Sequence, residues 1–147
     1  ATDVKADRLV QGAMKAQQLN LNNISFLRSN AANLLNLIPE NSIDQIWITF
    51  PDPMPKCRQE KHRLSNLTFL KLYKKLLKQE GEVLFKTDDL KLFEYSLEQI
   101  ERAGGQVLSL SRDLHGSDLS SDFKLKTTYE AKFLKQGKAI NFVKFKL

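Results

Sequence analysis

Hydrophobic and polar residues follow two different periods along this chain. Short apolar runs rich in β-branched residues predict strands, and these runs cover residues 24–28, 43–49, 82–86, 106–111 and 139–147. Between them, apolar side chains recur every three or four residues, which predicts helices over residues 6–19, 31–37 and 67–77 and a further helix that ends at about residue 102. Residues 127–134 are ambiguous and also compatible with a short helix. Residues 112–123 show neither period and predict a mobile surface loop.

The alternation of strands and helices indicates the fold class. It predicts an α/β fold with a mostly parallel sheet, right-handed crossovers and helices on both faces. Residues 1–5 are too short for a complete strand, although Asp3 lies where such a strand would end. The first helix is expected to bury one apolar stripe, formed by Leu9, Val10, Ala13, Met14 and Ala16.

Capping residues indicate where the later helices begin and end. Ser65 or Asn66 is expected to cap the start of the helix over residues 67–77, and Gly81 is expected to end that helix in the left-handed conformation. Asp88 or Asp89 is the expected cap of the next helix.

Composition narrows the class of protein further. The 147 residues are expected to form a single domain over 1–147, and no apolar run reaches the roughly 20 residues of a membrane span. A lone cysteine and no signal-like start predict a cytoplasmic protein. The 23 basic and 17 acidic residues leave a net charge of +6, which favours a polyanionic partner.

A proline-rich stretch over residues 49–56 stops one predicted strand abruptly. Its three prolines disfavour helical backbone before them, so Phe50, Asp52 and Met54 are expected to be extended. Asp52 is thus predicted to be a pre-organised carboxylate at a strand end. A basic cluster follows it directly, formed by Lys56, Arg58, Lys61, His62 and Arg63.

Polar side chains follow four of the predicted strands. They are Asp3, Asn30, Asp52 and the pair Thr87-Asp88. Parallel sheets bind ligands beyond the carboxyl ends of their strands, so these side chains are expected at one edge. Each alone is also compatible with a helix cap or a solvated loop acid.

The proline stretch carries a resemblance to a known family. Phe50-Pro-Asp-Pro-Met-Pro-Lys56, with Arg58, Lys61 and Arg63-Leu64 after it, resembles the signature of the bacterial tRNA (guanine-N7-)-methyltransferases. The chain departs from the family pattern at Met54, Cys57, Gln59, Glu60 and His62. The resemblance implies a Rossmann-like, S-adenosylmethionine-dependent methyltransferase fold with an antiparallel C-terminal strand, and tRNA as the partner.

The resemblance also implies residue roles. Asp3 would hold the ribose hydroxyls of S-adenosylmethionine, and Asn30 would face the adenine. Asp52 would lie between cofactor and guanine as the catalytic residue, with Lys56 and Asp88 contacting substrate. Further substrate contacts would come from Thr127, Thr128, Tyr129 and Glu130, and RNA contacts from Arg58, Lys61 and Arg63. Guanine N7 already has a free lone pair, so Asp52 would position the base rather than deprotonate it.

The chain contains no glycine-rich turn after a first strand, which a nucleotide-binding sheet of this class requires. We therefore expect an N-terminally truncated fragment that binds S-adenosylmethionine weakly.

Two alternatives stay open: a non-catalytic RNA-binding module derived from such an enzyme, and a methyltransferase acting on another substrate. His62 and His115 lack metal-ligand spacing, so no metal is predicted, and Cys57 is expected to be a bystander. The oligomeric state, monomer or homodimer, is left open.

Overall fold

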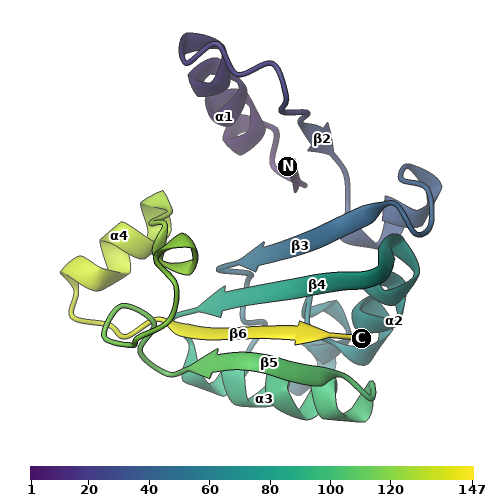
Figure 1. The fold of residues 1–147 in the computed structure, drawn as a ribbon, viewed down its shortest axis with the longest axis vertical. Coiled ribbons are helices and arrows are strands. Elements are labelled where there is room, and N and C mark those ends of the chain that lie inside the picture. Colours follow the sequence, from purple (N-terminus) through teal and green to yellow (C-terminus); the bar gives the residue numbers. More distant parts are fainter. The chain divides into compact units, whose positions relative to one another are not determined.

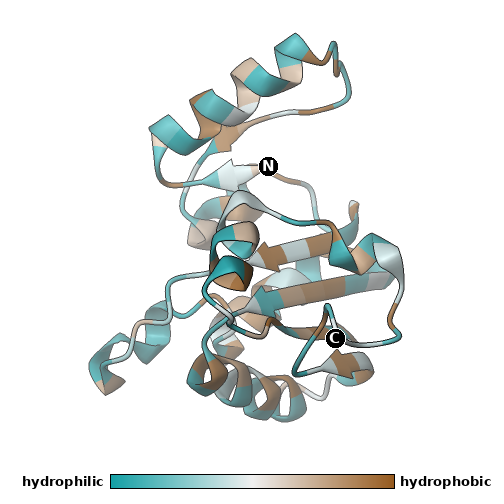
Figure 2. Ribbon diagram, turned by 90° about the vertical axis from the view of Figure 1, so that its left-hand side faces the viewer, coloured by the Kyte–Doolittle hydropathy of each residue, from teal (hydrophilic) through white to brown (hydrophobic).

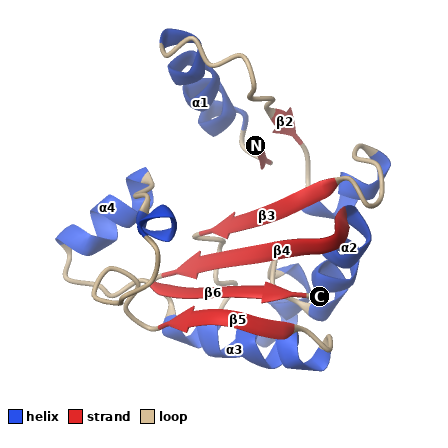
Figure 3. Ribbon diagram, in the orientation of Figure 1, coloured by secondary structure: helices blue, strands red, loops and turns tan.

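The computed structural model describes residues 1–147 and divides them into two compact units, residues 1–39 and residues 40–147. Figure 3 shows the helices, strands and loops of each. No helix is long and apolar enough to cross a membrane.

The first unit consists of two short parallel strands and two helices. In chain order these are β1 (Thr2–Asp3), α1 (Ala6–Gln18), β2 (Leu27–Arg28) and the 3-10 helix η1 (Ala31–Asn36). The predicted apolar stripe of α1 is wrong in part, because Val10 and Met14 are 55% and 57% exposed and only Ala16 is buried. A two-stranded sheet of two residues per strand offers α1 too little apolar surface to cover.

The second unit is built on a four-stranded sheet with the order β3-β4-β6-β5. Its elements are β3 (Ile43–Thr49), η2 (Cys57–His62), α2 (Leu67–Leu76), β4 (Leu77–Thr87), α3 (Leu90–Arg102), β5 (Gln106–Ser111), η3 (Ser121–Lys124), α4 (Thr128–Lys135) and β6 (Asn141–Lys146). β3 pairs with β4 in parallel, whereas β6 is antiparallel to both β4 and β5. Figure 1 shows β6 running against its neighbours. The predicted antiparallel C-terminal strand is confirmed.

Each face of this sheet has its own core. Side chains alternate between the faces, so Val83 and Phe85 of β4 pack on one side while Leu84 packs on the other. The first core also contains residues of α2 and α3, and the second is closed by residues 112–140, which include α4. Figure 2 shows long hydrophobic stretches in the strands and mixed faces on the helices. Coverage on both faces agrees with the prediction.

The expected helix end at Gly81 is wrong. α2 ends at Leu76, β4 starts directly afterwards, and Gly81 lies inside that strand. The pairing with β3 shifts register here, since Ile43 is opposite Leu77 but Gln45 is opposite Glu82. A Cβ on Gly81 would lie 2.9 Å from the Leu77 side chain, so the irregularity favours glycine.

The helix caps are among the expected residues. Asn66 accepts a hydrogen bond from the Thr68 N–H at 3.0 Å, and Asp89 accepts one from the Leu92 N–H at 2.7 Å. Residues 112–123 were predicted to be a surface loop, but part of this segment packs into the core, because Leu114 is fully buried.

Candidate active site

The proline loop follows β3 at the carboxyl edge of the four-stranded sheet. The Phe50 N–H still donates to the Lys86 carbonyl at 2.9 Å, which extends the ladder by one residue. Phe50 and Met54 then adopt φ values of 50° and 45°. The expectation that they are extended is therefore wrong: both have left-handed backbone, although the proline after each of them favours extended backbone. Such backbone in non-glycine residues is strained and is typical of functional loops.

Asp52 lies between these two strained positions and is exposed. Its only hydrogen bond is a long one of 3.5 Å from the Met54 N–H to Oδ1, and it forms no ion pair. The carboxylate consequently keeps nearly all of its acceptor capacity for a ligand.

Asp88 follows β4 at the same edge, because β3 and β4 are parallel neighbours. Its carboxylate forms an ion pair with Lys138 at 2.5 Å. Since Asp89 caps α3, Asp88 is not needed as the cap. The structure thus brings Asp52 and Asp88 to one edge, as predicted from the strand order.

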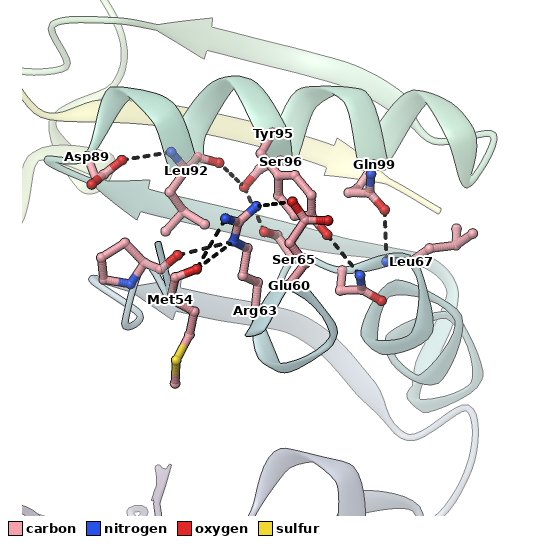
Figure 4. A network of polar contacts seen from close by, with 12 residues as sticks. Met54, Glu60, Arg63, Ser65, Leu67, Asp89, Leu92, Tyr95, Ser96 and Gln99 are labelled. Atoms are coloured by element: carbon pink, nitrogen blue, oxygen red, sulfur yellow. Dashed lines mark hydrogen bonds and ion pairs between the residues drawn. The ribbon is translucent and has the colours of Figure 1, made fainter. Parts of the chain in front are cut away.

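The predicted basic cluster divides into two groups. Lys56, Arg58 and Lys61 are exposed and form no ion pair. Arg63 instead turns inward, and its side chain is only 12% exposed. Its guanidinium donates to the carbonyls of Pro53 and Met54, as Figure 4 shows. The predicted RNA contact of Arg63 stays a prediction, and it would require the side chain to give up these internal partners.

A buried ionic cluster joins the end of β4 to α4. Lys86, 1% exposed, donates to both carboxylate oxygens of Glu130 at 3.1 and 3.2 Å and to the Leu125 carbonyl at 3.1 Å. The His115 ring Nε2 lies 2.8 Å from Glu130 Oε1. Figure 1 places α4 near the carboxyl ends of β3 and β4, where this cluster holds its first turn.

The four residues predicted to contact substrate on α4 differ in accessibility. Thr127 and Glu130 form a reciprocal capping box at the start of the helix. Thr128 and Tyr129 are exposed, Tyr129 by 47%. Glu130 is fully buried with every observed contact internal, so a direct contact with substrate would require this cluster to open.

Asp3 and Asn30 lie at the carboxyl ends of β1 and β2 in the first unit. Asp3 accepts from the Lys5 N–H at 2.9 Å and from Arg8 at 3.4 Å. Partial burial raises the pKa of Asp3, but these hydrogen bonds and the Arg8 charge outweigh it, and the pKa is lowered from 3.8. Asn30 caps η1 through its side-chain oxygen and lines an open hollow together with Val4 and Arg28.

Comparisons with known proteins identify the family of this chain. A family model described as "Putative methyltransferase" matches residues 1–143. The tRNA (guanine-N(7)-)-methyltransferase of Mycoplasma mobile is 42% identical over 142 residues, which cover 95% of this chain and 70% of that protein. That of Mycoplasmopsis pulmonis is 41% identical over 133 residues, 90% of this chain and 64% of that protein.

The chain belongs to the tRNA (guanine-N7-)-methyltransferase family. It spans less than two thirds of the length of several family members, among them the protein of Clostridioides difficile, which is 39% identical and covered to 64%.

Solved structures support the fold. A methyltransferase homologue from Pyrococcus horikoshii has a TM-score of 0.64 at 16% identity, with 99% of this chain and 52% of that one covered. A SAM-dependent methyltransferase from Aquifex aeolicus has a TM-score of 0.63 at 18% identity, with 99% and 66% covered.

Sequence reasoning missed two structural features around the candidate site. Lys86 directly follows the buried apolar run 83–85 of β4, and a charge at the end of such a run was a usable signal for a buried ion pair. Tyr95, over which the Arg63 guanidinium stacks, gave no comparable signal, because it looks like any aromatic residue of an amphipathic helix.

Proposed function

We propose that the protein carrying this chain transfers the methyl group of S-adenosylmethionine to N7 of a guanine in tRNA. The observation that carries the proposal is the exposed, uncommitted carboxylate of Asp52 on a strained loop. Asp88 ends the adjacent parallel strand, and unpaired cations follow in the same segment.

The chemistry requires alignment more than proton transfer. S-adenosylmethionine, when bound, would supply the methyl group, which the N7 lone pair would accept while the carbon–sulfur bonding electrons pass to sulfur. The guanine ring gains the positive charge, which a nearby carboxylate stabilises. Asp52 can also accept from the N1–H and N2–H₂ edge of guanine, so it would orient the base and stabilise the product charge.

Asp3 is suited to the ribose of the cofactor. Its lowered pKa keeps it ionised at neutral pH, and a carboxylate has about four acceptor positions, of which its two observed donors leave some free. Asn30 uses its oxygen for the cap of η1, but its amide NH₂ still offers donors for the adenine. S-adenosylmethionine would supply the electrophilic methyl group.

The tRNA would lie along Lys56, Arg58 and Lys61. These side chains are exposed and unpaired, as contacts to a phosphate backbone require. Because N7 faces the deep, narrow groove of A-form RNA, the target guanine would come from a loop or an irregular region of the folded tRNA.

The decisive experiment compares the full-length protein with its Asp52→Asn variant. Labelled S-adenosylmethionine and unmodified tRNA are mixed, and 7-methylguanine is measured after digestion. We expect transfer by the wild type and a strong loss in the variant, with unchanged thermal unfolding. If the wild type binds tRNA but transfers no methyl group, the chain is better described as an RNA-binding module. If the variant turns over normally, Asp52 is a solvated loop residue without a role in methyl transfer.

A further inference from the structure

Arg63 lies in the basic segment but points away from solvent, toward the loop that carries Asp52 (Figure 4). We propose that Arg63 is a positioning residue, which holds the Pro53-Met54 backbone so that Asp52 is presented to the guanine. This inference rests on the proposed function and concerns the same site.

The contacts of Arg63 account for its inward orientation. Nε donates to the Pro53 carbonyl at 3.1 Å and to the Met54 carbonyl at 3.3 Å, and a terminal nitrogen donates to Met54 at 3.1 Å. The other terminal nitrogen forms an ion pair with Glu60 at 3.4 Å. A rigid guanidinium fork can bind several acceptors at once, which a lysine ammonium cannot do in the same geometry.

The guanidinium is also fixed from its flat side. Its central carbon lies 4.3 Å from the centroid of the Tyr95 ring. The Tyr95 hydroxyl accepts a hydrogen bond from the Asn66 side chain at 2.8 Å, and Asn66 caps α2. Arg63 therefore packs on a platform formed by Tyr95 of α3 and Asn66 at the start of α2.

That platform is well connected to the rest of the unit. Ser65 and Ser96, both buried, share a hydrogen bond of 2.7 Å, and Gln99 accepts one from the Leu67 N–H at 3.3 Å. These bonds join the start of α2 to α3. Through Arg63, the position of the loop backbone is set by this rigid part of the fold.

The strained backbone explains why the loop requires such a contact. Phe50 and Met54 flank Asp52 with φ values of 50° and 45°, and conformations of this kind persist only where surrounding contacts hold them. Without Arg63, the Met54 side of the loop loses its hydrogen bonds and can relax. A displacement of about 1 Å at a reacting centre can reduce the rate about 100-fold.

This role predicts effects that differ from those of a phosphate contact. In the full-length protein, Arg63→Ala should lower kcat about 10- to 100-fold, with a much smaller change in KM for tRNA. The salt dependence of tRNA binding should stay unchanged. Lys61→Ala should instead weaken binding and lower the salt slope by about 0.7 to 0.9. Arg102→Ala, which removes an exposed charge at the end of α3, should change neither quantity and serves as the charge-matched control.

Hydrogen exchange provides a test that does not depend on activity. The amides of Met54 and Gln59, which donate to Asp52 Oδ1 and to the Lys56 carbonyl, should exchange faster in Arg63→Ala than in the wild type, while those of α3 keep their protection. Arg63→Lys preserves the charge and most of the volume, and it should show the same faster exchange in the loop. This variant keeps the test available if Arg63→Ala does not fold. If the wild type transfers no methyl group, the proposed function fails while the exchange and salt measurements still test the loop. Unchanged exchange at Met54 and Gln59 would overturn the inference, and a reduced salt slope beside it would make Arg63 a phosphate contact.

Discussion

The buried ion pair between Lys86 and Glu130 allows the sharpest test of how the site is held. Lys86→Met keeps the aliphatic stem and removes the ammonium group, so the Glu130 carboxylate loses donors at 3.1 and 3.2 Å. Both side chains are at most 1% exposed, and water cannot replace the lost partner.

The expected magnitude follows from that burial. Removing one partner of a buried pair costs about 3–5 kcal/mol, because the remaining charge is desolvated without compensation. His115 and the Thr127 N–H still contact Glu130, so we expect about 3 kcal/mol, the lower end of that range. A domain is stable by only about 5–15 kcal/mol, and the loss is therefore a large share.

Urea denaturation of the wild type and of Lys86→Met measures this difference. The double variant Lys86→Met/Glu130→Gln is the matched control, since it removes both charges and leaves the shape nearly constant. We expect it to lose less stability than the sum of the two single variants. A loss below about 1 kcal/mol for Lys86→Met would contradict the reasoning, because that is the size of a surface ion pair.

Two further predictions concern the surface and the first unit. The double variant Lys56→Ala/Arg58→Ala should weaken tRNA binding and lower its salt slope by about 1.4 to 1.8 for two lost phosphate contacts, and an unchanged slope would indicate a solvated face. Arg8→Ala should raise the pKa of Asp3 toward 3.8, as followed by a carboxyl NMR titration, because a charge and a hydrogen bond are lost. The stabilisation that Asp3 contributes is present above pH 3.8 and is lost as the pH falls through its lower folded pKa, so Asp3→Asn should destabilise at neutral pH and have little effect in strong acid.

Local pattern was sufficient for much of the fold. The strands over 43–49 and 106–111 have the bounds predicted from periodicity, and Asn66 and Asp89 are caps of the expected type. Strand order along the chain was also enough to place Asp52 and Asp88 at one edge, because parallel strands end together. The strand bounds and the caps depend on interactions between residues near in sequence, which a period or a cap reveals, whereas the common edge follows from the parallel pairing of consecutive strands.

The partners of the charged side chains were decided only by the tertiary structure. Lys86 meets Glu130 across 44 positions, Lys138 meets Asp88 across 50, and Asn66 meets Tyr95 across 29. The sequence shows that a cation is present but not whether it faces solvent, and Arg63 was therefore assigned to the RNA with its exposed neighbours. Only the packing of α2 and α3 beneath the proline loop puts backbone carbonyls and an aromatic ring within reach of that guanidinium. Its low exposure favours an internal contact over a phosphate contact, because a desolvated charge requires partners inside the protein.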